Sequence, residues 1–167
     1  MNALLARPEL QDHPFLRNAP AEFLNQLAPF ETEVDFAAGE TILQEDHYAD
    51  RLYLIVEGDV ALEVGITGKR IDTIGAGEVL GWSWLYPPYV SRFTARAVTA
   101  VHALELNGPA LLVLAEEDHS FGYELMKRIT ACTIRRLDCL RKRVCLTMRR
   151  EPDREMKNAF PNRPTRC

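Results

Sequence analysis

The chain has few cysteines, few histidines and no long apolar run, and each shortage excludes a class of protein. The four cysteines form no CxxC pair and have no histidine at metal-ligand spacing, which excludes zinc-finger and thioredoxin-like motifs. We expect Cys132, Cys139 and Cys145 to be reduced and buried. No segment approaches the roughly 18–20 apolar residues of a membrane span, and the first residues lack a signal peptide's apolar region. The sequence therefore predicts a cytoplasmic protein with no membrane partner.

Catalytic motifs are also missing. The four histidines, His13, His47, His102 and His119, form no His-x-His or His-x-x-x-His pair, so no metal site is expected. The chain has no nucleophile motif, P-loop or dinucleotide fingerprint, and these absences argue against an enzyme. After Val144 no pair of helices with a recognition face can form, so sequence-specific DNA binding is not expected.

Charge is distributed unevenly along the chain. The net charge is −4, yet residues 135–167 hold eleven Lys and Arg against four Asp and Glu. Three prolines, Pro152, Pro161 and Pro164, and few apolar residues follow Glu151. Residues 149–167 are therefore predicted to be a basic, disordered tail. Such a tail is either solvated or contacts nucleic acid, a membrane surface or an acidic protein.

Short strands separated by glycine-centred turns occupy the middle of the chain. From Glu31 to Leu106 such turns recur every 8–12 residues or so, which is typical of a β-barrel or sandwich. Apolar residues alternate on both sides of Gly58, which predicts a hairpin over residues 51–64. A second hairpin is predicted to turn at residues 65–68.

Helical patterns flank this β region. A short helix is predicted within residues 14–27, a second over residues 110–117, and a long one over residues 121–148. Along the long helix, one line of apolar and threonine residues recurs at sequence spacings of four and three, as in a heptad seam. Its members are Met126, Thr130, Thr133, Leu137, Leu140 and Val144. We expect a homodimer through Met126, Leu137, Leu140 and Val144, with a capping helix as the alternative.

The richest segment, residues 77–97, lies between two predicted strands. It contains two glycines, a Pro pair, five aromatic residues and two arginines. Joining two strands requires none of this variety, so the segment is interpreted as the wall of a pocket.

In element order and motifs the chain resembles the cyclic-nucleotide-binding domain of the Crp/Fnr type over residues 14–148. The matching motifs are residues 36–42 (FAAGETI), 49–62 (ADRLYLIVEGDVAL), 74–81 (IGAGEVLG) and 95–100 (ARAVTA). The resemblance implies a jelly-roll-like β-roll (a double-stranded β-helix), flanked by a short N-terminal helix and C-terminal helices. Asp46 stands where the family usually has a turn glycine, and Asp tolerates a left-handed backbone.

The resemblance also implies a ligand site. In the family a cassette, which begins here at Gly81 and ends near Ala95, holds the nucleotide. Its Glu accepts the ribose hydroxyl and its Arg pairs with the cyclic phosphate. Here Trp82 stands at the Glu position and cannot accept a hydrogen bond. Arg92 lies at about the phosphate-binding position, and Arg96 is expected to be structural. The candidate ligand residues are Gly81, Trp82, Ser83, Trp84, Arg92, Thr94, Thr130 and Thr133.

Two functions remain open from the sequence. In the first, the chain is a stand-alone regulatory module that binds a small anionic effector, with cAMP or cGMP as candidates and no resident cofactor. In the second, Trp82 plugs the pocket, and the chain is a ligand-independent module for dimerisation or for binding another protein. Arg92 favours the first function and Trp82 favours the second.

Overall fold

The structure is a computed structural model that describes residues 12–159, with side chains described for residues 12–146. Two helical segments precede the strands, α2 (Ala21–Leu27) and η2 (Ala28–Phe30). The strands are β1 (Glu31–Phe36), β2 (Thr41–Leu43), β3 (Arg51–Glu57), β4 (Val60–Val64), β5 (Lys69–Ile74), β6 (Val79–Leu80), β7 (Thr94–Ala97) and β8 (Val101–Asn107). Between them lies η3 (Ser83–Leu85), and α3 (Gly108–Glu117) and α4 (His119–Ala159) follow.

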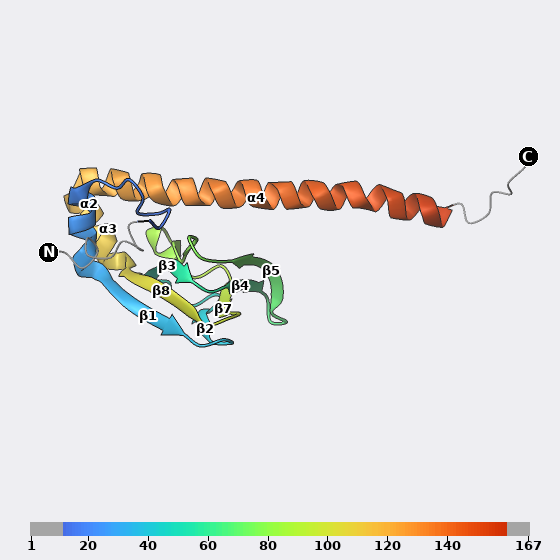
Figure 1. Cartoon of the computed structure of the whole chain (residues 1–167), viewed down its shortest axis with the longest axis horizontal. Coiled ribbons are helices and arrows are strands. Elements are labelled where there is room, and N and C mark those ends of the chain that lie inside the picture. Colours follow the sequence, from blue (N-terminus) through green and yellow to red (C-terminus); the bar gives the residue numbers. More distant parts are fainter. Residues whose placement is uncertain (1–11, 160–167) are drawn as a thin grey trace, which may run out of the picture. The chain divides into compact units, whose positions relative to one another are not determined.

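The eight strands form two four-stranded antiparallel sheets, with the orders β1-β8-β3-β6 and β2-β7-β4-β5. This is the β-roll that the resemblance implies, and α2 and α3 lie at the end of the roll where β1 begins and β8 ends (Figure 1). The two sheets enclose an apolar core. Its members are Ile42, Tyr53, Ile55, Val60, Leu62, Ile74, Leu80, Ala95, Ala97, Val101 and Ala103.

The hairpin predicted over residues 51–64 is wrong. β3 and β4 belong to different sheets, so the turn at Gly58 carries the chain from one sheet to the other. Gly58 does adopt a positive φ of 91°, and a Cβ there would overlap the carbonyl oxygen of Ala100. The prediction failed because both faces of β3 are buried: Leu54 on one face and Ile55 on the other are fully buried. A central strand of this kind takes partners distant in sequence.

Other predictions for the β region and the helices are confirmed. β4 and β5 form the hairpin predicted to turn at residues 65–68. Asp46 has a φ of 61°, the left-handed conformation expected of a glycine substitute. α3 contains the helix predicted over residues 110–117 and begins two residues earlier, at Gly108, where the Asn107 side chain caps it by accepting a hydrogen bond from the Ala110 amide at 3.0 Å.

The last helix is longer than the sequence indicates. α4 continues through residues 149–159, which were predicted to be part of a disordered tail, while residues 160–167 lie outside the described residues. The prediction rested on Pro152, Pro161, Pro164 and the scarcity of apolar residues, but most residues around Pro152 are Arg, Glu, Met and Lys, which favour helix. Cys132 is buried as expected, whereas Cys139 and Cys145 are exposed.

The chain divides into two compact units, residues 1–129 and 130–167. The first contains the roll, α2, α3 and the first turns of α4. The second is the remainder of α4. At the start of α4, Asp118 accepts a hydrogen bond from the Gln26 amide and others from the Phe121 and Ser120 backbone amides, and these bonds lower the pKa of its carboxyl.

Candidate functional site

The cassette connects the two sheets of the roll. It leaves β6, passes through Gly81 and η3, and returns into β7. Gly81 has a φ of 88°, and a Cβ at this position would lie 2.5 Å from the carbonyl oxygen of Arg51 on β3. Both the backbone conformation and the close approach require glycine here. The start of the cassette is therefore fixed against β3.

A polar network supports this fixed point. Tyr53 pairs with Leu80, the residue before Gly81. Burial raises the pKa of the Tyr53 hydroxyl, and the charge of Glu105 and a hydrogen bond with it raise the pKa further. Arg51 contacts Glu105 with Nε 3.0 Å from Oε1. Tyr53 thus remains a neutral hydrogen-bond donor beside the cassette at physiological pH.

The two tryptophans of the cassette have different environments. Trp84 is 2% exposed and packs so closely on Gly108 of α3 that a Cβ there would overlap the indole. Its Nε1 has no hydrogen-bond partner among the described residues. Trp84 therefore packs η3 against α3 rather than facing a ligand. Trp82 is half-buried, as is Ser83, which begins η3. Trp82 is the indole that can meet a ligand or fill its place.

Two arginines lie at the end of the cassette, and their surroundings differ sharply. Arg96 donates to the Gly39 carbonyl at 3.1 Å and to the Thr41 hydroxyl at 2.9 Å, and it pairs with Glu63 at 3.4 Å. Its predicted structural role is confirmed. Arg92 is exposed and, within the described part of the chain, makes no hydrogen bond or ion pair. The backbone next to it is anchored, because Ser91 and His47 are joined by a 2.9 Å hydrogen bond. Within the described residues, the guanidinium of Arg92 is thus unpaired, while the backbone next to it is held in place.

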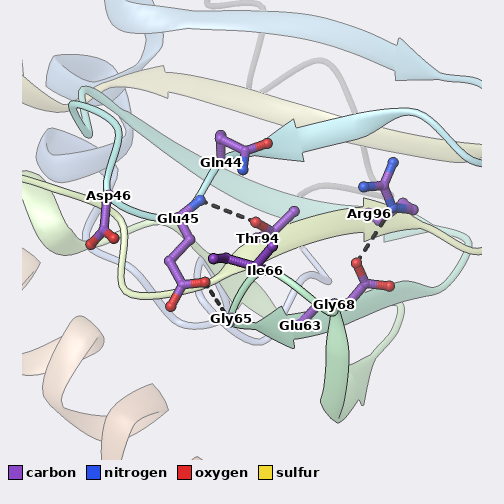
Figure 2. A pocket seen from close by; sticks show the side chains of 9 residues that line it. All are labelled: Gln44, Glu45, Asp46, Glu63, Gly65, Ile66, Gly68, Thr94 and Arg96. Carbon is purple, nitrogen blue, oxygen red and sulfur yellow. Dashed lines mark hydrogen bonds and ion pairs between the residues drawn. The ribbon is translucent and has the colours of Figure 1, made fainter.

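Thr94 lies on the opposite side of the sheet from the core. Its neighbour Ala95 faces the core, so strand alternation directs Thr94 outward. There Thr94 accepts a hydrogen bond from the Glu45 amide at 3.1 Å and lines a cavity of about 400 Å³. Figure 2 shows this outer pocket. Its lining is Gln44, Glu45, Asp46, Glu63, Gly65, Ile66, Gly68, Thr94 and Arg96. Three carboxylates against one paired arginine make it a poor site for an anion.

Thr130 and Thr133 belong to the second unit and are exposed on α4. Their role as ligand residues stays a prediction. The seam residues are also exposed: Met126, Leu137, Leu140 and Val144 have 38–65% of their surface accessible.

The sequence reasoning missed one buried carboxylate, Asp72. Asp72 is 8% exposed and pairs with Leu62 on β4, which in turn pairs with Ala95 at the end of the cassette. Leu62 and Ala95 both face the core, so Asp72 points into the roll as well. Its Oδ1 accepts a hydrogen bond from the Thr73 amide at 2.7 Å. The sequence does contain a signal for this burial: Asp72 lies two residues before Ile74, so the two side chains share one face of β5.

Comparison with known proteins identifies one family. The family model for the cyclic nucleotide-binding domain matches residues 33–118. No curated protein matches the chain. Among solved structures, a Geobacter metallireducens protein named for cyclic nucleotide binding is 30% identical with a TM-score of 0.71, and the match covers 77% of this chain and 95% of that one.

Two further structures share the fold at lower identity. The N-terminal domain of a transcriptional regulator from Streptomyces coelicolor is 24% identical, with a TM-score of 0.60 and coverage of 79% of this chain and 94% of that one. The Thermus thermophilus catabolite activator protein is 20% identical, with a TM-score of 0.61, and the match covers 81% of this chain and 63% of that one. No described helix is long and apolar enough to span a membrane. Among the described residues, no three His, Cys, Asp or Glu side chains gather into a metal site.

Proposed function

The chain belongs to the cyclic nucleotide-binding domain family, and on this basis we propose that it is a regulatory module that binds a small anionic effector of the cyclic-nucleotide class at its cassette. The family is one of regulatory binding domains, not of enzymes. The observation that carries the proposal is the exposed guanidinium of Arg92 in the cassette, which has no ion pair or hydrogen bond within the described residues, whereas Arg96 has three polar partners.

In this proposal each group has a chemical role. Arg92 pairs with the cyclic phosphate, because a guanidinium matches the geometry of phosphate oxygens. Trp82 replaces the usual carboxylate and stacks on the effector. Asp72, the buried carboxylate inside the roll, accepts hydrogen bonds from the sugar or base. Binding shifts the cassette, and α4 carries the change to a protein partner; this requires an effector that prefers one of two states.

Arg92→Ala is expected to weaken binding of cAMP or cGMP about 10- to 100-fold, since a hydrogen bond to a charged group contributes about 1.5–3 kcal/mol. Calorimetric titration of both nucleotides measures this. Arg70→Ala is the matched control, because Arg70 is another exposed arginine of the roll and should leave the affinity unchanged. Equal weakening by both variants would mean that only the overall charge matters, and Arg92 would lose its assigned role.

The second candidate function is a ligand-independent module for protein interaction. The half-buried Trp82 at the position of the usual carboxylate favours it. The same titration decides between the two functions: no heat and no thermal shift at millimolar cAMP or cGMP would exclude cyclic-nucleotide sensing and favour a plugged pocket.

We also propose that the module is a homodimer through the exposed seam of α4. Replacing Leu137 and Leu140 together by Gln is expected to convert a dimer to a monomer, since each buried leucine contributes about 1.5–3 kcal/mol. Analytical ultracentrifugation of the full chain measures the mass. Arg135→Gln with Lys142→Gln is the control, because these residues lie on the opposite side of the helix. A wild-type chain that sediments as a monomer would refute the dimer.

A further inference from the structure

Residues 12–17, here called the N-terminal strap, are pinned to the roll through one buried histidine. The carbonyl of His13 accepts hydrogen bonds from the Leu16 and Arg17 amides, both at 2.8 Å, so the strap is a tight turn. Phe15 and Leu16 are 1% exposed and His13 is 5% exposed. The strap is therefore packed into the protein, and its one imidazole lies away from water.

Both ring nitrogens of His13 have partners of fixed polarity. Nε2 lies 3.1 Å from the carbonyl oxygen of Ile55 on β3, and Nδ1 lies 3.2 Å from the backbone nitrogen of Phe15. A carbonyl oxygen can only accept and a backbone amide can only donate. Nε2 must therefore carry the proton, and Nδ1 must offer its lone pair. Only the neutral form of the imidazole satisfies both contacts.

Protonation would break this arrangement. An imidazolium carries N–H groups at both positions, so Nδ1 would face the Phe15 N–H with a proton of its own, and a charge would occupy a site away from water. Charged groups occur on each element around His13. They include Asp12 and Arg17 on the strap, Arg51 and Glu57 on β3, Glu78 on the turn before β6, and Glu124, Lys127 and Arg128 in the first turns of α4.

The strap connects three parts of the first unit. The Ile55 carbonyl that His13 contacts also accepts a hydrogen bond from Gly77 at 2.8 Å. Pro14 packs on Gly77, where an added Cβ would lie 3.3 Å from the proline ring. On α4, Arg128 donates to the Phe15 and Arg17 carbonyls, at 2.5 and 3.2 Å, and pairs with Glu124 at 2.6 Å. The strap thus joins β3, the turn that leads into β6 and the cassette, and the first turns of α4.

We propose that His13 is a proton-sensitive latch: its neutral form holds the strap on β3, and its protonation releases the strap from both the turn before the cassette and Arg128. A free imidazole has a pKa of about 6.5. The released strap binds one proton more than the latched strap, so falling pH favours release. With a single proton involved, the opening constant is expected to rise by up to about tenfold for each pH unit below about 6.5.

Amide hydrogen exchange followed by NMR on the full chain tests the latch. Between pH 7.5 and 5.5, the protection factors of the Leu16, Arg17 and Gly77 amides are expected to fall, by up to about tenfold over the last pH unit. The protection factors of amides within β8 should not change. His13→Gln supplies one donor and one acceptor but cannot titrate, so its protection factors should be independent of pH. His119→Gln, which removes an exposed histidine, should behave like wild type.

The imidazole nitrogen shifts of His13 give a readout that needs no variant, so the test holds even if His13→Gln does not fold. We expect an Nε2–H tautomer at pH 7.5, with release of the strap tracking its protonation. A His13 that takes up a proton while Leu16 and Arg17 stay protected, for example by pairing with Glu78, would overturn the proposal. Equal pH dependence in wild type and His13→Gln would overturn it as well.

Discussion

Gly81→Ala is expected to lower the free energy of unfolding by about 3 kcal/mol and to disable the cassette. A left-handed alanine costs roughly 1–2 kcal/mol, and forcing an atom into a packed site costs about 1–3 kcal/mol more. The new Cβ would lie 2.5 Å from the Arg51 carbonyl oxygen, a backbone atom that cannot rotate away. Denaturant unfolding measures the loss.

Gly39→Ala separates the two contributions to this loss. Gly39 has the same φ of 88°, but a Cβ there would have no atom within 4 Å. Its replacement should therefore cost only the left-handed strain, roughly 1–2 kcal/mol. If both variants lose the same stability, the close approach of β3 to the cassette contributes nothing, and the fixed start of the cassette is wrong.

Trp84→Ala is expected to lower the free energy of unfolding by about 3–5 kcal/mol, the usual range for a large buried aromatic residue. Its indole is 2% exposed and fills the space above Gly108. Thermal and denaturant unfolding report the change. Trp84→Phe should recover most of the loss, because the indole N–H has no hydrogen-bond partner among the described residues.

Trp82→Ala is the matched comparison within the same cassette. Trp82 is only half-buried, so its removal should cost less than half as much stability as removal of Trp84. A larger loss at Trp82 than at Trp84 would reverse the roles given to the two indoles, and Trp82 would then be the packing residue.

The strands and turns could be predicted from the sequence because their signals are local, while their arrangement as a roll was implied by the resemblance. Turn glycines, the alternation along β4 and β5, and the Asn107 cap each depend on neighbouring residues. The pairing of β3 could not, since its partners β8 and β6 are distant in the chain and both of its faces are buried. Alternation on a single face suggested a hairpin that the second buried face rules out.

The candidate site, like the fold, could be predicted only in part from the sequence. The resemblance to the Crp/Fnr type indicated the cassette and, within it, Arg92 and the unusual Trp82 as candidates. It could not separate Trp84 from Trp82, because only the packing of η3 on α3 makes one indole internal. Asp72 was missed although it shares a face of β5 with Ile74, because its burial also depends on the cross-strand pairing with Leu62.

The cassette is attached unequally at its two ends. β7 lies between β2 and β4 and is held from both sides, whereas β6 has two residues and lies at the edge of its sheet, paired only with β3. The end of the cassette is therefore held by two neighbouring strands, while its start depends on β3 alone, through the pairing of β6 and the close approach of Gly81. A cassette that moves on binding is then expected to do so between these two held points, in residues 82–93, which include both Trp82 and Arg92.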